Sequence, residues 1–387
     1  MHRRNFMTAG SIAAAGSIAA SLTTDRAQAQ PRQETEWRHR TSDMAYRRLG
    51  RTGYMISEVV MGGNLIAPDN NEHILLAVDM GLNYFDTAPA YGGTKSEQGY
   101  GALLKADPSL RDRVFINSKI STFDQNRGKL YSAIYDGLSD SEKKAIDAEV
   151  DALIERRGIL ESEYIGWYFQ AQLTEIKAAY LSNVMEKKYG NRIDRRREYH
   201  DLIISSVEDS LRRLNTDYLD IVMCPHGASS PEELAIPEIH EALEKLKRDG
   251  KVRAFGVSAH NDPAGVIRAA LDAGFYDMAM VAYNVTNGQF LESTLAEAYR
   301  KDFGIVSMKV ARPVNPGRAS NIPQSRLDKL NHAIPGDMSI PKKAYLWALQ
   351  NSNITAVISE MGNADLVRDN LPLAGKKVGR VPMEEIN

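Results

Sequence analysis

The pattern that most constrains the fold is a strict alternation of short apolar segments with longer amphipathic segments, from residue 59 to residue 370. Each apolar segment has the length of one buried strand, and the segments between them carry a helical period. Eight strand–helix pairs in this order predict the α/β fold class, as a (β/α)8 TIM barrel over residues 46–375. The expected strands are 59–61, 83–86, 114–119, 218–223, 252–258, 278–281, 304–308 and 354–358, and the expected helices are 73–80, 97–105, 198–214, 237–249, 264–273, 291–301, 339–350 and 364–370.

Polar side chains stand at the ends of three of these strands. Asp86 ends the second strand and Tyr91 follows it in the loop, while Lys119 ends the third strand and His226 follows the fourth. The carboxyl ends of barrel strands meet at one mouth, where barrel enzymes carry their active sites. The pattern therefore indicates a catalytic group. The structural alternative is an ion pair between Asp86 and Lys119 inside the mouth, with an incidental tyrosine and histidine.

The order Asp, Tyr, Lys, His at strand ends resembles the aldo-keto reductase family. The resemblance extends to the Tyr-Arg-Arg-Leu-Gly-Arg-Thr-Gly run at 46–53, to Ser96-Glu97 and to 210–220. It spans residues 46 to 373 apart from one insertion. It implies an enzyme that uses NADP or NAD for reversible carbonyl/alcohol oxidoreduction of a small carbonyl or sugar-like substrate.

The four residues suit the proton chemistry that such a reaction requires. Reduction of a carbonyl needs a hydride from a reduced nicotinamide and a proton for the developing alkoxide. Tyr91 is the expected general acid/base, although a phenol with a pKa near 10 is a weak acid at neutral pH. We expect Lys119 to lower the pKa of Tyr91 and Asp86 to hold Lys119 in place. His226 is expected to hydrogen-bond the carbonyl oxygen.

The resemblance also implies a nicotinamide cofactor near the ends of other strands. Gly62 follows the first strand, where the backbone can approach a ligand closely. Ser258 keeps the family's serine after the fifth strand, while Ala259 replaces the family's asparagine. Lys309, after the seventh strand, is expected either to meet a cofactor phosphate or to form a salt bridge.

The remaining cofactor candidates follow the eighth strand: Glu360 lies just before the last helix, and Arg368 and Asn370 lie on it. Asn370 matches an asparagine of the family. Glu360 is acidic where the 2′-phosphate of NADP would need a base, and it would suit the ribose diol of NAD. Arg368 would partly compensate for this acid. The family favours NADP and Glu360 favours NAD, so both remain open, as does weak or lost cofactor binding; no metal is expected.

Residues 121–195 form an insertion after the third strand, far longer than an ordinary βα loop. A capping box from Ser139 to Glu142 predicts one helix that ends before Gly158, and a second helix is expected from Tyr164 to Gly190. The insertion is therefore predicted as a helical hairpin on the catalytic face. Its aromatic residues either stack on a substrate or form the hairpin's own core; they are Tyr164, Trp167, Tyr168 and Tyr180.

The first 29 residues read as a twin-arginine export signal. Arg3 and Arg4 precede an Ala-rich apolar run at 9–22, and a small-x-small cleavage pattern ends at Ala29. The run of roughly 14 residues is too short to cross a bilayer, so the mature protein is not expected to be membrane-embedded. The alternative is a basic tail with an accidental arginine pair. The expected location is periplasmic or extracellular, after passage through the twin-arginine export machinery.

Composition adds a few limits. The net charge is −2, which gives no reason to expect nucleic acid as a partner. Cys224 is the only cysteine, so no disulfide forms within the chain. Residues 30–45 are expected to be a polar linker and 376–387 a C-terminal tail.

The competing function is a non-catalytic exported barrel that binds a carbohydrate or a protein partner through the inserted helical hairpin.

Overall fold

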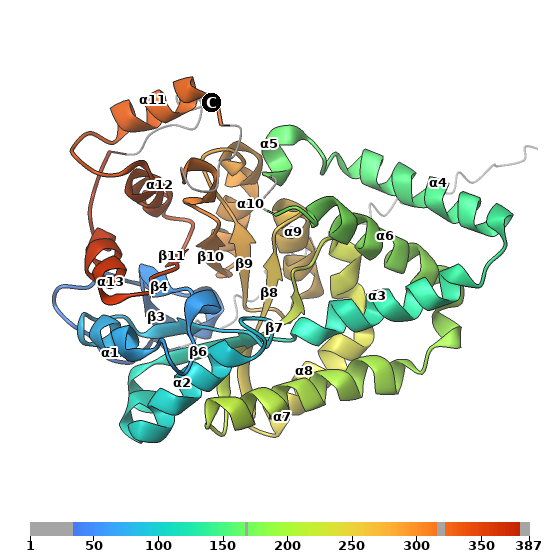
Figure 1. Cartoon of the computed structure of the whole chain (residues 1–387), viewed down its shortest axis with the longest axis horizontal. Coiled ribbons are helices and arrows are strands. Elements are labelled where there is room, and N and C mark those ends of the chain that lie inside the picture. The colour runs from blue at the N-terminus through green and yellow to red at the C-terminus, as the bar shows by residue number, and fades with distance from the viewer. Residues whose placement is uncertain (1–33, 167–168, 316–321, 380–387) are drawn as a thin grey trace, which may run out of the picture. The chain divides into compact units, whose positions relative to one another are not determined.

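Eight parallel strands close into a barrel, which confirms the predicted fold class (Figure 1). The structure is a computed structural model, and it describes residues 34–166, 169–315 and 322–379. The predicted export signal and the aromatic residues Trp167 and Tyr168 lie outside the described residues. Around the barrel the strands run β10-β11-β4-β5-β6-β7-β8-β9. Their bounds are β4 (Val59–Met61), β5 (Tyr84–Asp86), β6 (Phe115–Lys119), β7 (Leu219–His226), β8 (Val252–Ala259), β9 (Met278–Ala282), β10 (Gly304–Met308) and β11 (Ala356–Ser359).

Helices surround the strands and bury the outer face of the barrel (Figure 1). Local sequence determines where several of them begin and end. The side chain of Asp262 caps one helix by accepting from the N–H of Gly265, and Gly274 ends the same helix in the left-handed conformation. The helices predicted between the strands are α1 (Glu72–Asp79), α2 (Lys95–Ala106), α7 (Leu202–Leu214), α8 (Pro237–Arg248), α9 (Pro263–Ala273), α10 (Gly288–Arg300), α12 (Ile340–Leu349) and α13 (Ala364–Asn370).

Three details of the barrel's own strands and helices differ from the prediction. The strand predicted to end at 223 continues as β7 to His226, so the histidine belongs to the strand end. A π-helical turn, Arg196–Asp201, replaces the first part of the helix predicted from 198. The short helix α11 (Gln324–Ala333) was missed because its mostly polar sequence offers little apolar periodicity.

The pleat of the strands places the functional residues in the barrel interior. Successive strand residues point to opposite faces, so every second residue faces inward. Tyr84 and Phe115 lie in the interior cluster. Asp86 is two residues beyond Tyr84, and Asn117 and Lys119 are two and four beyond Phe115. All three are buried at the carboxyl end of the barrel.

The amino end of the barrel is closed by a small three-stranded sheet. Strand β2 (Tyr46–Arg48) pairs antiparallel with β3 (Tyr54–Ser57), and β1 (Glu36–Trp37) pairs with β3 on its other side. Residues 36–38 are therefore part of the fold rather than the predicted linker. Arg38 donates to the carbonyl of Val114 and pairs with buried Asp220. Because polar contacts hold this segment in place, its sequence carries no apolar pattern that would have predicted a strand.

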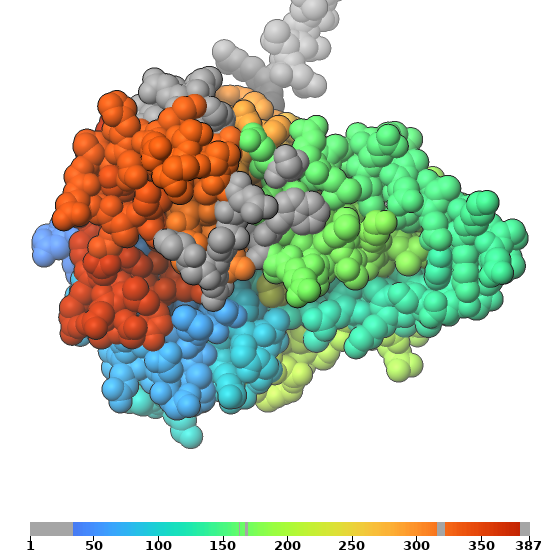
Figure 2. All heavy atoms as spheres, turned by 45° about the horizontal axis from the view of Figure 1, so that its top comes forward, coloured from blue at the N-terminus to red at the C-terminus, as the bar shows by residue number. Residues whose placement is uncertain are grey.

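The insertion contains three long helices instead of the predicted two. They are α3 (Ser121–Asp136), α4 (Asp140–Arg157) and α6 (Gln172–Tyr189), with the short α5 (Ser162–Ile165) before α6. The capping box at Ser139 is confirmed. Helix α3 was missed because its buried face, which includes Phe123 and Tyr131, is interrupted by the polar Arg127. Helix α6 packs against α3 and α4. Figure 2 shows that the insertion forms an arm that stands out from the side of the barrel.

The described part of the chain contains no helix with both the length and the apolarity that crossing a membrane requires.

Candidate active site

A buried ion pair forms the base of the mouth. Lys119 Nζ lies 2.5 Å from Asp86 Oδ1 and 3.0 Å from the carbonyl oxygen of Thr87, and Asn117 donates to the same Asp86 oxygen at 2.7 Å. Burial raises the pKa of Asp86 and lowers the pKa of Lys119, while each charge opposes the shift of the other. The pair therefore holds a lysine nitrogen at a fixed place in a dry site.

Tyr91 lies over this pair. Lys119 Nζ is 4.6 Å from the centre of the Tyr91 ring, and the ring of His226 meets Tyr91 edge-on with 6.0 Å between centroids. The structure thus brings the four predicted residues together. Burial, and then the carboxylate of Asp86, raises the pKa of Tyr91 well above its ordinary value. The predicted lowering by Lys119 is therefore wrong for this state, because Asp86 already balances the lysine charge.

His226 is held in its neutral form. Burial, and then the charge of Lys119, lowers its pKa well below the ordinary value. Its Nδ1 atom lies 2.8 Å from Ser121 Oγ, and its main-chain N–H donates to Asp124 Oδ2 at 3.2 Å. Both partners belong to the first turn of α3, so the insertion contacts the predicted catalytic histidine directly.

His260 is a site residue to which the sequence reasoning gave no role. It follows Ser258 by two positions, at the end of β8, and its ring lies edge-on to Phe169 of the insertion at 5.8 Å. Burial, and then the charge of Lys309, lowers the pKa of His260 to about 3. The sequence does contain a signal for it: His260 ends a Ser-Ala-His run in which Ser258 is a predicted cofactor residue.

Two of the predicted cofactor residues lie at the same mouth. Ser258 is buried in β8 opposite His226 of β7. Lys309 follows β10 with φ +59°, and its charge acts on His260. Gly62 lies further round the mouth, where an added Cβ would come within 3.1 Å of Glu360 Cγ. The group that closely approaches the backbone of Gly62 in this structure is therefore the side chain of Glu360.

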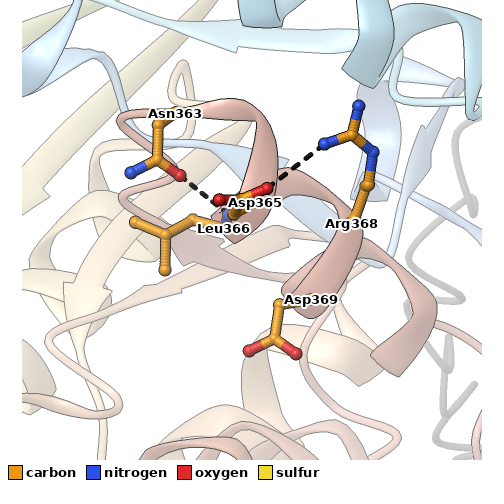
Figure 3. A pocket seen from close by; sticks show the side chains of 5 residues that line it. All are labelled: Asn363, Asp365, Leu366, Arg368 and Asp369. Atoms are coloured by element: carbon orange, nitrogen blue, oxygen red, sulfur yellow. Dashed lines mark hydrogen bonds and ion pairs between the residues drawn. The ribbon is translucent and has the colours of Figure 1, made fainter.

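Of the three cofactor candidates predicted near the end of the barrel, Arg368 lines a surface hollow of about 460 Å³, whereas Glu360 and Asn370 are not among its lining residues (Figure 3). Arg368 pairs with Asp365 at 3.3 Å on the exposed face of α13. Asn370 donates to Ser359 Oγ at 3.0 Å and so fixes the end of β11. The hollow is lined by Asn363, Asp365, Leu366, Arg368 and Asp369.

Two of the insertion's aromatic residues serve packing. Tyr164 is buried, donates to Asp262 Oδ1 at 2.5 Å and accepts from the N–H of Ala264 at 3.1 Å. Tyr180 is fully buried between the inserted helices. Neither side chain can stack on a substrate, so the stacking alternative is wrong for these two. The contacts of Tyr164 anchor α5 to the start of α9, beside the mouth.

The mouth can perform acid–base chemistry on a carbonyl group. A protonated phenol, a fixed lysine and a neutral imidazole converge on one small region, and the groups of three or more side chains that a metal ion would need are not found among the described residues. These groups suit a reaction in which a carbonyl oxygen gains a proton, such as the reduction of a carbonyl by a hydride donor.

Comparison with known proteins defines the family. The model of the Aldo/keto reductase family matches residues 61–172 and 176–378, more than half of the chain, so the protein belongs to this family. It is therefore an NAD(P)-dependent oxidoreductase.

Individual relatives are distant but extend over most of the chain. L-galactose dehydrogenase of Arabidopsis thaliana is 22% identical over 350 residues, which cover 84% of this chain and 86% of the relative. The NADH-specific methylglyoxal reductase of Escherichia coli (strain K12) is 24% identical over 359 residues, 86% and 90% of the two chains. The solved structure of aldo-keto reductase AKR11C1 from Bacillus halodurans (holo form) matches with a TM-score of 0.56 and 20% identity, over 89% of this chain and 94% of that one. This structural likeness supports the fold.

Proposed function

We propose that the protein is an exported aldo-keto reductase that reduces a small carbonyl or sugar-like substrate reversibly, with Tyr91 as general acid/base. The observation that carries the proposal is the position of Tyr91 directly over the buried Asp86–Lys119 pair. The relatives named for L-galactose and for methylglyoxal support the substrate class.

Tyr91, Lys119 and Asp86 each have a distinct task in the proposed proton transfer. When bound, a reduced nicotinamide would supply the hydride that the carbonyl carbon needs. Tyr91 holds its proton in the resting site, because its pKa is raised, and donates it to the carbonyl oxygen as negative charge develops there. Lys119 then stabilises the phenolate, and Asp86 keeps Lys119 in place. In the oxidative direction Tyr91 takes the proton back.

The chain's own residues suit a dinucleotide, with NADH preferred. Ser258 and Lys309 stand at the mouth where the nicotinamide and a phosphate would be held. A 2′-phosphate would meet exposed Glu360, whose charge also reaches Tyr91, while Arg368 is paired with Asp365. An adenosine ribose with a free diol would avoid this repulsion.

We expect the purified protein to bind NADH at least tenfold more tightly than NADPH, because removing one unfavourable charge contact is worth about 1.4 kcal/mol. Equilibrium titration followed by nicotinamide fluorescence measures both affinities. The variant Glu360→Lys should reverse or abolish the preference. Glu297→Lys is the matched control, since this partly exposed glutamate lies on α10, away from the strand end that carries Glu360, and pairs with Lys301. Tighter binding of NADPH by the wild type would overturn the assignment.

We expect export to depend on the arginine pair near the N-terminus, because the twin-arginine route reads that pair as an address. In a bacterium with this route, nearly all of the wild-type full chain should be recovered outside the cytoplasm, beginning near Gln30. The double variant Arg3→Lys, Arg4→Lys should stay inside as precursor, whereas the control Arg26→Lys should not. Cell fractionation with N-terminal sequencing decides this, and equal export of the double variant would refute the signal.

A further inference from the structure

The first residue of the insertion makes an unusual contact for a surface arm, since it reaches the imidazole of His226. Ser121 begins α3, directly after β6, and is buried. Its Oγ atom lies 2.8 Å from His226 Nδ1 and accepts the main-chain N–H of Ala90 at 3.2 Å. The hydroxyl therefore joins the loop that carries Tyr91 to the ring of His226.

The positions of the hydrogens follow from counting donors and acceptors. A main-chain N–H can only donate, so Ala90 uses one acceptor site of Ser121 Oγ. Within the described residues the hydroxyl hydrogen is satisfied only if it is donated to His226 Nδ1, the one other partner of Oγ. Nδ1 is therefore the acceptor. A neutral imidazole carries one hydrogen, which must be on Nε2.

We propose that Ser121 is a positioning residue that holds His226 as the Nε2–H tautomer, so that the ring donates a hydrogen bond to the substrate's carbonyl oxygen. The need for a donor there rests on the proposed function, whereas the tautomer itself does not. With the opposite tautomer, the Nε2 lone pair would face the oxygen as it becomes negative, and the interaction would be repulsive.

A second contact from the same helical turn supports this role. Asp124, three residues after Ser121 in the first turn of α3, accepts the main-chain N–H of His226 through Oδ2 at 3.2 Å. The first turn of the insertion thus holds the histidine by its backbone and by Nδ1. Among the described residues no partner is recorded for Nε2, which leaves that hydrogen for a ligand. The insertion is therefore part of the site's machinery as well as a surface arm.

The tautomer can be read without any substrate. We expect long-range proton–nitrogen spectra of the full chain, labelled with ¹⁵N-histidine, to show a protonated Nε2 and an unprotonated Nδ1 for His226 at neutral pH. The spectrum of His226→Gln identifies its signals. In Ser121→Ala the Nδ1 shift should move toward a mixture of tautomers, and Ser121→Thr should restore it. Thr122→Ala is the matched control, since that hydroxyl contacts Ser206.

Kinetics give the second readout. We expect Ser121→Ala to lower kcat about tenfold with little change in KM, because one oriented hydrogen bond in the transition state is weakened. An Nδ1–H tautomer in the wild type, or an unchanged spectrum in Ser121→Ala, would overturn the inference. A protein with the expected spectrum that turns over no carbonyl would support the tautomer and contradict the proposed function.

Discussion

Replacing Tyr91 by phenylalanine is expected to lower turnover of a carbonyl substrate by about 10²- to 10⁴-fold, the usual contribution of a positioned general acid. The substitution removes only the hydroxyl. The ring keeps its contact with Lys119 Nζ at 4.6 Å and its edge contact with His226, so the site should retain its shape. Affinity for the dinucleotide should therefore stay within about twofold of the wild type, a difference of less than 0.5 kcal/mol.

The measurement is kcat from the oxidation of the reduced nicotinamide, together with a fluorescence titration of the nucleotide. Tyr100→Phe is the matched control. Tyr100 is buried, stacks on Phe85 at 4.6 Å, and its hydroxyl has no hydrogen-bond partner among the described residues. The turnover of Tyr100→Phe should therefore be close to that of the wild type. If Tyr91→Phe kept more than about a tenth of the wild-type kcat, the general acid would have to be another group.

Replacing Asp220 by asparagine is expected to destabilise the fold by about 3–5 kcal/mol, the usual cost of leaving buried charges without a partner. Asp220 is fully buried at the amino end of β7, and its two oxygens lie 2.8 Å from Arg38 and 2.8 Å from Arg111. Asparagine keeps the shape but removes the charge, so the arginines remain buried with less compensation. We expect the unfolding midpoint to fall by on the order of 10 °C.

Thermal or denaturant unfolding measures this loss. The matched control is Asp277→Asn, because Asp277 accepts the N–H of Phe255 at 2.8 Å much as Asp220 accepts the N–H of Ile116. Asp277 has no arginine ion pair among the described contacts, so Asp277→Asn should lower the free energy of unfolding by only about 1 kcal/mol. Equal losses in the two variants would show that the arginines are not the cause. Turnover per folded molecule should be preserved in Asp220→Asn, since the network lies at the end of the barrel away from the mouth.

Much of the fold could be predicted because it depends on periodicity. Alternating strands and helices leave few arrangements that bury every apolar face, and the barrel is one of them. Four site residues could be located for a related reason. Parallel strands present their carboxyl ends together, so Asp86, Lys119 and His226 had to meet once the barrel closed, and Tyr91 follows Asp86 by only five residues.

The features that could not be predicted depend on contacts distant in sequence or on burial. Ser121 and His226 are 105 residues apart, and nothing local marks their contact. The pKa of Tyr91 rises instead of falling because burial outweighs a lysine that Asp86 already balances. Arg38 joins the fold through an ion pair with Asp220, which leaves no trace in the apolar pattern.

The most direct test of the proposed function is to follow the hydrogen that is transferred. Purified protein is mixed with NADH or NADPH that carries deuterium at the transferring position of the nicotinamide C4, and with small carbonyls such as methylglyoxal and simple aldoses. We predict that mass spectrometry finds the deuterium on the former carbonyl carbon of an alcohol product, and that Tyr91→Phe loses this transfer although it still binds the nucleotide. A folded wild-type protein that binds the nucleotide but transfers no label to any carbonyl would contradict the proposal.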